Sequence, residues 1–550
     1  MPKKFLQIHP QDNVLVALTD LQKGETIEHN SLSFSLASDV RAKHKFPIHP
    51  LAKGDEVVMY GVLIGKCIQA IRQGELIHTH NMVHASNENY KKSKTVTWTP
   101  PNVDRWKNRT FNGYHRSDGR VGTANYWLFI PMVFCENRNL ELIKEALTTQ
   151  LGYGSTHKYK KMTSTIIEEL KKGGDINSLS LDTILNKEET ISTERVFANV
   201  DGVKFLTHEG GCGCSRDDSD TLGQLLAAYA DHPNVGGVTV LSLGCQHLQV
   251  KQFKDFLKKR NPSFDKPLYI FEHQEKGTED NLLGQAIRQT FIGLQEINKI
   301  GRKPAPLSQL CIGVKCGGSD GFSGISANPA VGHTADLLSA LGGSVLLAEF
   351  PELFGAEQDL VDRCVTPELA DKFTHLMKSY NEKAKAVGSG MHMNPSPGNI
   401  RDGLITDAMK SAGAARKGGT SPVTDVLNYT EKSVKPGLNL VCTPGNDVEA
   451  TTGKAASGAT LILFTTGLGT PTGNVVCPTI KISTNTALKN RMPDIIDIDA
   501  GPIITGEKTI EESADEILEY CIKAASGEII PKAVQLGQDD FIPWKRGVSL

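Results

Sequence analysis

The stretch Gly313–Gly332 reads GVKCGGSDGFSGISANPAVG, and it follows directly on the apolar run 310–314. An apolar run that enters a glycine-rich loop predicts a buried strand ending in a site, because glycine lets the backbone present bare N–H groups at close range. The loop also carries a thiol, a hydroxyl, a carboxylate and an amide, in Cys316, Ser319, Asp320 and Asn328. Residues 335–341 are typical of a helix, and a strand, a polar loop and a helix form the usual ligand-binding unit of open α/β sheets. A tight turn around a buried structural cysteine is the competing interpretation of this loop taken alone.

The same strand, loop and helix unit recurs along the second half of the chain. Further strands are expected at 344–350, 439–442 and 460–464, and the last enters a polar loop that begins with Thr465 and Thr466. Repeated units of this kind predict a mainly parallel sheet covered by helices. None of the glycine loops has the spacing of a phosphate-binding or dinucleotide-binding motif, which argues against a kinase or a nicotinamide-dependent dehydrogenase.

The length of 550 residues predicts two to four domains. Residues 1–85 predict a small β domain, because short strand-like runs alternate with glycine turn signals. Residues 86–105 are polar and proline-punctuated, as in a linker. A middle α/β domain is expected over 106–304, with the lysine-rich segment 152–195 as a surface elaboration, and a parallel α/β domain over 305–550.

Composition limits the partners. The chain has 60 Lys and Arg against 62 Asp and Glu, so a net charge of −2 gives no signal for nucleic acid or an anionic membrane. No apolar run approaches the ~18 residues of a membrane span, and the first ten residues lack the apolar core of a signal peptide. We therefore expect a cytoplasmic protein that binds a small anionic molecule in a local pocket, while self-association into a homo-oligomer stays open.

Two more cysteine loops follow strands expected at 203–207 and 238–243, and they carry Cys212, Cys214 and Cys245. The 11 cysteines are an odd number without the spacing of a disulfide framework or of a zinc ribbon. Together with Cys316, thiolates from these separate loops could hold an iron–sulfur cluster with one open iron, a Lewis acid suited to removing a hydroxyl. The alternative is that these cysteines are small buried apolar residues.

Seven histidines lie within the first 85 residues. Most such histidines are surface or satisfied core residues. His78 and His80 differ, because alternate residues of an extended strand share a face and two imidazoles could reach one ion.

Several long motifs of this chain resemble the altronate/galactarate dehydratase family of sugar-acid hydro-lyases. They are DNV at 12–14, HK at 44–45, HTHN at 78–81, GYHRSDGRVGT at 113–123, CGGSDGFSGISANPAVG at 316–332, TPG at 443–445 and FTTGLG at 464–469. The resemblance covers nearly the entire chain apart from 152–195. It implies an N-terminal SAF-like β domain, a middle α/β domain and a C-terminal Rossmann-like domain. The chain departs from the family pattern at Ala124, Gln246 and Leu468, where charged residues are expected.

The resemblance implies an iron-dependent hydro-lyase that converts a sugar acid into a 2-keto-3-deoxy acid. The expected cofactor is Fe²⁺, with another divalent metal or an iron–sulfur cluster as alternatives. D-Altronate is the expected substrate, because residues 78–81 match the altronate type more closely than the galactarate type.

Such an elimination needs a base, an acid and a cation for the developing enediolate. The catalytic candidates are His44, Lys45 and Asp320. The substrate-binding candidates are Arg116, Arg120, Ser319, Asn328, Thr465 and Thr466. The metal-binding candidates are His78, His80 and Cys316, with His44 considered beside them.

Other functions remain open on the sequence. They are a galactarate dehydratase, a sulfolactate-type sulfo-lyase that expels sulfite, and a sugar-acid binding protein without catalysis. We expect the active site between residues 1–85 and the C-terminal sheet, with His44 on one side and the loop 316–320 on the other. The C-terminal loops are poor in imidazole whereas the N-terminal region is rich in it, and domain interfaces favour small-molecule pockets.

Overall fold

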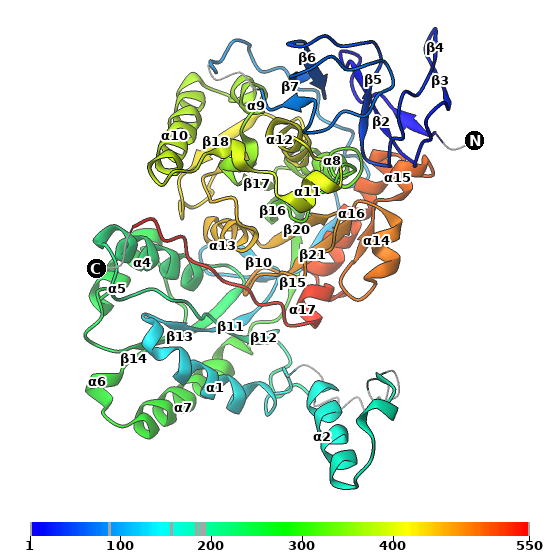
Figure 1. Cartoon of the computed structure of the whole chain (residues 1–550). Coiled ribbons are helices and arrows are strands. Elements are labelled where there is room, and N and C mark those ends of the chain that lie inside the picture. Colours follow the sequence, from blue (N-terminus) through cyan, green and yellow to red (C-terminus); the bar gives the residue numbers. More distant parts are fainter. Residues whose placement is uncertain (1–2, 86–89, 155–157, 182–184, 186–193, 548–550) are drawn as a thin grey trace.

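The computed structural model describes residues 3–85, 90–154, 158–181, 185 and 194–547. Figure 1 shows a small N-terminal β domain resting on a central C-terminal α/β domain, with the middle α/β domain on the opposite side. The multidomain α/β fold expected from the sequence is therefore confirmed. Among the described residues, no helix is long and apolar enough to cross a membrane.

The N-terminal domain consists of short antiparallel sheets. Its strands are β1 (Phe5–Leu6), β2 (Val14–Ala17), β3 (Thr26–His29), β4 (Leu32–Ser35), β5 (Lys45–Pro47), β6 (Glu56–Met59), β7 (Val62–Cys67) and β8 (Met82–Val83). Strand β7 runs unbroken through Gly65. A Cβ at Gly65 would lie 2.6 Å from the carbonyl oxygen of Val83, so this glycine serves close strand packing and not a turn.

The middle domain is built on a parallel sheet with strand order β12–β11–β13–β14. Its strands are β11 (Tyr126–Pro131), β12 (Gly202–Phe205), β13 (Val235–Ser242) and β14 (Leu268–Glu272). Its helices include α1 (Asn137–Thr148), α4 (Arg216–Asp231), α5 (Val250–Arg260), α6 (His273–Lys276) and α7 (Glu279–Ile297). Trp127 is fully buried and fills the space above Gly237 and Gly293, where any side chain would collide with its ring. The helix α2 (Lys158–Lys171) projects away from the sheet, as expected of a surface elaboration (Figure 1).

A short antiparallel sheet leads into and out of the middle domain. It pairs β9 (Thr110–His115) with β10 (Val121–Gly122) and with β15 (Lys303–Pro306). Phe111 and Trp106 are buried in the core of the C-terminal domain. The two ends of the middle domain are thereby fixed to the C-terminal domain.

The C-terminal domain contains a seven-stranded parallel sheet of order β18–β19–β17–β16–β20–β21–β22. Its strands are β16 (Cys311–Cys316), β17 (Ser344–Ala348), β18 (Val423–Leu427), β19 (Gly437–Val441), β20 (Leu461–Thr466), β21 (Thr479–Ser483) and β22 (Ile498–Asp499). The chain first builds outward from β16 on one side and later returns to add β20 on the other. This reversal makes the carboxyl ends of β16 and β20, where Cys316 pairs with Thr465, the topological switch point at which such sheets bind ligands.

The helices of this domain include α8 (Ala327–Ala340), α9 (Glu357–Arg363), α10 (Pro367–Ala386), α12 (Asp407–Ala415), α13 (Asp447–Ser457), α14 (Thr486–Arg491) and α16 (Ile510–Ala525). Helix α8 begins eight residues before the position expected from the sequence. Pro329 lies in its first turn, where a missing N–H costs nothing, so the proline does not delay the helix. Asn328 consequently belongs to the helix and not to the glycine loop.

Two features join the domains. The N-terminal domain packs Val57, Met59 and Ile64 against Phe322 and Ile325 of the C-terminal domain in one apolar cluster. The C-terminal tail crosses to the middle domain, where the N–H groups of residues 546 and 547 donate to the Asp218 carboxylate, and Figure 1 shows it lying along α4.

We expect Gly321→Ala to weaken the docking of the N-terminal domain. A Cβ at Gly321 would lie 2.5 Å from the carbonyl oxygen of Lys43 and 2.7 Å from its Cβ. Forcing extra atoms into a packed interface costs about 1–3 kcal/mol of unfolding free energy, which urea denaturation measures. Gly284→Ala is the control, because nothing lies within 4 Å of its Cβ. Unchanged stability of Gly321→Ala would contradict the tight contact.

Candidate active site

A buried cluster of charged residues occupies the carboxyl edge of the C-terminal sheet. The Lys315 ammonium lies 2.6 Å from Glu349 and 2.8 Å from Asp447. The Lys417 ammonium lies 2.8 Å from Glu352. Both lysines and both glutamates are almost completely buried. Buried charges are costly unless they are paired, so this concentration at a switch point indicates a functional site.

Glu349 immediately follows β17 and has a left-handed backbone, with φ of 69°. Its N–H donates to the Thr443 hydroxyl at 3.0 Å, which holds this conformation from the end of β19. A non-glycine residue in this conformation stores strain, and such strain is concentrated at functional sites.

The pKa values of Glu349 and Glu352 are shifted in opposite directions. Burial, and then the charge of Glu352, raise the pKa of Glu349. Burial also opposes ionisation of Glu352, but the Lys417 and Lys315 charges outweigh it and hold the pKa of Glu352 well below its usual range. Two neighbouring carboxyl groups whose pKa values differ in this way can take different roles: one exchanges a proton near neutral pH, and the other stays ionised.

Two more buried lysines, Lys454 and Lys481, lie in the C-terminal domain near Lys315. The ammonium nitrogens of Lys454 and Lys481 are buried and have no hydrogen-bond partner among the described residues. Burial lowers the pKa of each to about 7. A carboxylate entering the cluster would supply the missing partner and favour the charged form of both lysines.

Cys316 lies inside this cluster and not at a solvent-facing position. Its sulfur lies 3.3 Å from the Lys417 ammonium and 3.4 Å from a Glu352 carboxylate oxygen. Burial, followed by the Glu352 charge, raises the pKa of the Cys316 thiol. The thiol is therefore a hydrogen-bond donor to Glu352.

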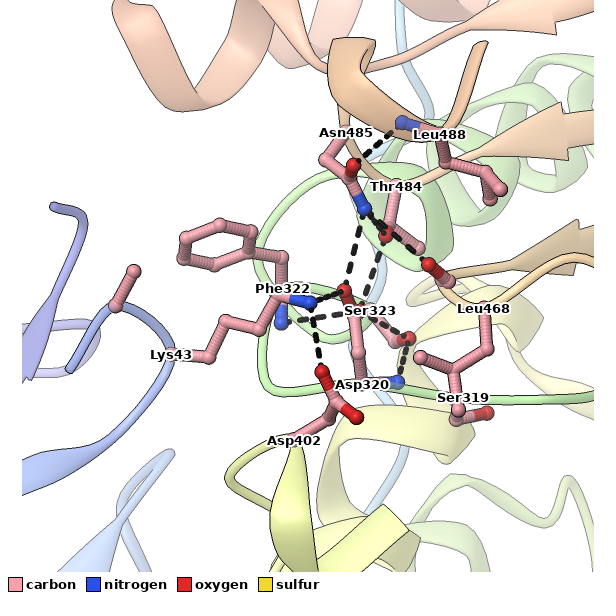
Figure 2. Close-up of polar contacts among 12 residues, drawn as sticks. Lys43, Ser319, Asp320, Phe322, Ser323, Asp402, Leu468, Thr484, Asn485 and Leu488 are labelled. Atoms are coloured by element: carbon pink, nitrogen blue, oxygen red, sulfur yellow. Dashed lines mark hydrogen bonds and ion pairs between the residues drawn. The ribbon is translucent and has the colours of Figure 1, made fainter. Parts of the chain in front are cut away.

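Asp320 connects the glycine loop to its surroundings (Figure 2). One carboxylate oxygen accepts from the Phe322 N–H, the Ser323 hydroxyl and the Thr484 hydroxyl at 3.0–3.2 Å. The other accepts from the Asn485 amide at 3.3 Å and pairs with the Lys43 ammonium at 3.0 Å. So many donors suit a role in positioning the loop, and the predicted catalytic role of Asp320 stays a prediction.

The N-terminal domain brings its own titratable groups to this contact. Lys45 is fully buried and donates to the carbonyl oxygens of Lys43 and Gly403 at 2.8 and 2.7 Å. Burial lowers the pKa of Lys45 to about 7. The ring of His44 is buried, and its Nδ1 lies 3.2 Å from the Ala42 carbonyl oxygen. Burial lowers the pKa of His44, so a neutral imidazole is favoured.

The predicted metal ligands fall into two groups. The rings of His44, His78 and His80 stack in a row, with centroids 6.0 and 6.1 Å apart, whereas Cys316 is bonded within the lysine and glutamate cluster. In the part of the chain that the structure describes, no group of three or more His, Cys, Asp or Glu side chains is placed to hold a metal ion. The structure thus does not assemble His78, His80 and Cys316 as one ligand set.

Four of the predicted substrate-binding side chains lie around the glycine loop. Thr465 donates its hydroxyl proton to the Asn328 amide oxygen at 2.6 Å, and the Asn328 amide donates to the Gly413 carbonyl. The Thr466 hydroxyl accepts from the Gly469 N–H at 3.0 Å. Ser319 is different, because its buried hydroxyl has no partner among the described residues.

The two predicted substrate-binding arginines lie in the middle domain. Arg116 is buried and donates to the Pro233 carbonyl and the Asn125 amide oxygen. Arg120 pairs with Asp118 and with the buried Asp231. These contacts account for both guanidinium groups as structural ties at the middle-domain junction, and substrate binding by them stays a prediction.

Most charged members of this site were not predicted from the sequence. They are Lys315, Glu349, Glu352, Lys417, Lys454 and Lys481. A signal was present for Lys315, because it interrupts an apolar run that forms a largely buried strand. A lysine is rarely buried without a partner, so its position inside such a strand indicates an anion nearby.

This fold and this site define an α/β enzyme that handles a small anionic molecule at the end of a parallel sheet. Three family models match consecutive parts of the chain. They are "Altronate/galactarate dehydratase SAF domain" at residues 3–85, "D-galactarate dehydratase/Altronate hydrolase, second domain" at 113–298 and "D-galactarate/Altronate dehydratase, C-terminal" at 307–549.

The chain is also similar over most of its length to characterised enzymes. It is 36% identical to altronate dehydratase of Bacillus subtilis, with 96% of each chain covered. It is 33% identical to altronate dehydratase of Escherichia coli, covering 94% of this chain and 95% of the relative. It is 29% identical to galactarate dehydratase (L-threo-forming) of Escherichia coli, covering 95% and 93%. The chain belongs to the altronate/galactarate dehydratase family of hydro-lyases.

We expect Lys417→Met to destabilise the protein by about 3–5 kcal/mol, because it leaves the Glu352 charge buried without its partner. Urea denaturation at neutral pH measures this loss. Lys372→Met is the control: its pair with Glu431 is exposed at 3.0 Å and is worth about 0–1 kcal/mol.

The ion pair between Glu352 and Lys417 also predicts how the free energy of unfolding depends on pH. Because the folded pKa of Glu352 is lowered from its ordinary 4.5, its contribution is complete above that value and is lost as the pH falls toward the folded pKa. Equal losses in the Lys417 and Lys372 variants would contradict this account.

Proposed function

We propose that the protein dehydrates D-altronate to the corresponding 2-keto-3-deoxy acid. The observation that carries this proposal is the cluster of buried lysines and two glutamates with divergent pKa values, in which the ammonium groups of Lys454 and Lys481 have no hydrogen-bond partner among the described residues. A sugar acid supplies the carboxylate that these lysines lack. The higher identity to two altronate dehydratases than to the galactarate dehydratase supports altronate as the substrate.

The lysines have a second task in the reaction. Removal of the proton at C2, next to the carboxylate, places negative charge on the carboxylate oxygens as an enediolate. Ammonium groups fixed in a site that excludes water stabilise this charge far more than they would in water. Lys315 and Lys417 are already held in place by carboxylates, so no reorganisation is needed when the charge develops.

Glu349 is our candidate for the base. Its raised pKa brings proton exchange closer to neutral pH, the condition for efficient general-base catalysis. When the base takes the C2 proton, the electron pair forms a bond between C2 and C3 and the C3 hydroxyl leaves. A proton delivered to that hydroxyl releases water, and the enol tautomerises to the 2-keto acid.

The acid is proposed to come from the N-terminal domain, from Lys45 or His44. Lys45 has a pKa of about 7 and is partly protonated under working conditions. His44 adjoins it and would act as a relay or as the alternative donor. The buried Ser319 hydroxyl, on the loop between the two sides, has no hydrogen-bond partner among the residues that the structure describes and is suited to bind a substrate hydroxyl.

The substrate is tested by assaying the purified, iron-supplied protein anaerobically with altronate, galactarate and sulfolactate. We expect the highest kcat/KM for altronate, measured as formation of the 2-keto-3-deoxy acid. A higher kcat/KM for galactarate would overturn the substrate assignment. Release of sulfite from sulfolactate would favour the sulfo-lyase, whose beta subunit in Chromohalobacter salexigens is 26% identical over 439 residues. Tight altronate binding without turnover would indicate a binding protein.

The acid and base assignments are tested by Glu349→Gln and His44→Ala. Each is expected to lower kcat by at least ~100-fold, the usual contribution of a positioned proton-transfer group. His49→Ala is the control, because His49 is an exposed histidine of the same domain. In the wild type, kcat/KM should fall as the pH drops through the raised pKa of Glu349, because a protonated base cannot accept the C2 proton. Full activity of Glu349→Gln, with an unchanged pH profile, would refute its role.

A further inference from the structure

Three loops carrying cysteines meet at the carboxyl edge of the middle sheet. Cys135 follows β11, Cys212 follows β12 and Cys245 follows β13, and β11 lies between the other two strands. The carboxyl ends of adjacent parallel strands share one edge, so topology alone places the three thiols on neighbouring loops. The loops expected from the sequence to supply thiolates carry Cys212 with Cys214, Cys245 and Cys316, and Cys316 belongs to the other sheet.

Backbone hydrogen bonds hold the three loops together. The Phe134 N–H, next to Cys135, donates to the Gly210 carbonyl at 3.0 Å. The His247 N–H, from the Cys245 loop, donates to the Gly211 carbonyl at 3.0 Å. Gly211 has φ of 97°, and any side chain there would collide with the Met132 carbonyl, so only glycine allows this close contact.

Side chains around the Cys245 loop hold it in place by hydrogen bonds. Gln246 is buried, donates to the Ser242 hydroxyl and the Leu248 carbonyl at 2.7 and 3.0 Å, and accepts from the Gly244 N–H. A glutamate could not donate these bonds, so the departure from the family pattern fixes the Cys245 loop without adding a charge. The Gln274 amide, from α6, donates to the Cys245 sulfur at 3.2 Å. Donors to cysteine sulfur are a usual means of tuning iron–sulfur sites.

Cys135 and Cys245 are exposed and Cys212 is half-buried. A cavity of ≈ 600 Å³ adjoins Cys212 and is also lined by Glu209 and Lys545, and this volume suits a small ligand.

We propose that Cys135, Cys212 and Cys245 bind an iron–sulfur cluster through three thiolates, leaving one iron open toward the cavity. A cluster attaches each thiolate to a different iron, so the sulfurs need not converge on one point. Among the described residues no group of three or more His, Cys, Asp or Glu side chains is placed to hold a single metal ion, and a cluster does not require such a group. The proposal concerns binding and stands independently of the substrate proposed above.

The test uses the full chain, reconstituted anaerobically with ferrous iron and sulfide. We expect bound iron and acid-labile sulfide, with broad visible absorbance that air bleaches. Cys135→Ser, Cys212→Ser and Cys245→Ser should each lose the absorbance and the sulfide. Cys316→Ser, the matched control, should retain both, and circular dichroism should show all four variants folded.

A second measurement does not depend on any variant. In the reconstituted wild type, the three thiols should be protected from alkylation, and chelation of the iron should expose them, as mapped by mass spectrometry of the labelled peptides. Iron without labile sulfide, or a cluster that survives in the three serine variants, would overturn the proposal. A cluster-loaded protein that fails to dehydrate altronate would count against the proposed function and leave this site standing.

Discussion

The ion pair between Asp320 and Lys43 is the contact on which the site depends. Asp320 is completely buried, and an uncompensated buried carboxylate costs several kcal/mol. Its compensation comes partly from the loop itself, partly from Thr484 and Asn485 after β21, and partly from the N-terminal domain. The N-terminal domain therefore completes the compensation of the Asp320 charge, so its docking stabilises the glycine loop in the folded conformation.

The local parts of this fold could be predicted from the sequence because their causes are local. The run into Cys316, the glycine loop and the polar ends of β17, β19 and β20 follow from apolar runs and turn residues that lie next to one another. The strands β18 and β21 were missed for the same reason. Each of these strands is only five residues long and contains a charged residue, Asp425 in β18 and Lys481 in β21. Neither sequence forms an apolar run, and pairing with neighbouring strands in the folded sheet determines their conformation.

The site was predicted less well than the fold because its electrostatics are not local. Lys315 contacts Glu349, which lies 34 residues away in the sequence, and Lys417 contacts Cys316, which lies 101 residues away. The sequence shows that a lysine interrupts a buried strand, but not which carboxylate neutralises it. The histidine metal site stays a prediction: the rings of His44, His78 and His80 lie beside one another in the N-terminal domain, whereas Cys316 lies in the lysine and glutamate cluster.

The first turn of α13 links the lysine and glutamate cluster to the cysteine loops. Asp447 contacts Lys315 at 2.8 Å, while Glu449, two residues later, lines the cavity beside Cys212. Asn446 caps the same turn by accepting from the N–H groups of residues 448 and 449, which fixes both acidic side chains relative to the helix. Lys454 lies on the following turns of α13, and its ammonium has no hydrogen-bond partner among the described residues. Because Asp447, Glu449 and Lys454 lie on one helix, α13 contributes side chains both to the lysine and glutamate cluster and to the wall of the cavity beside Cys212.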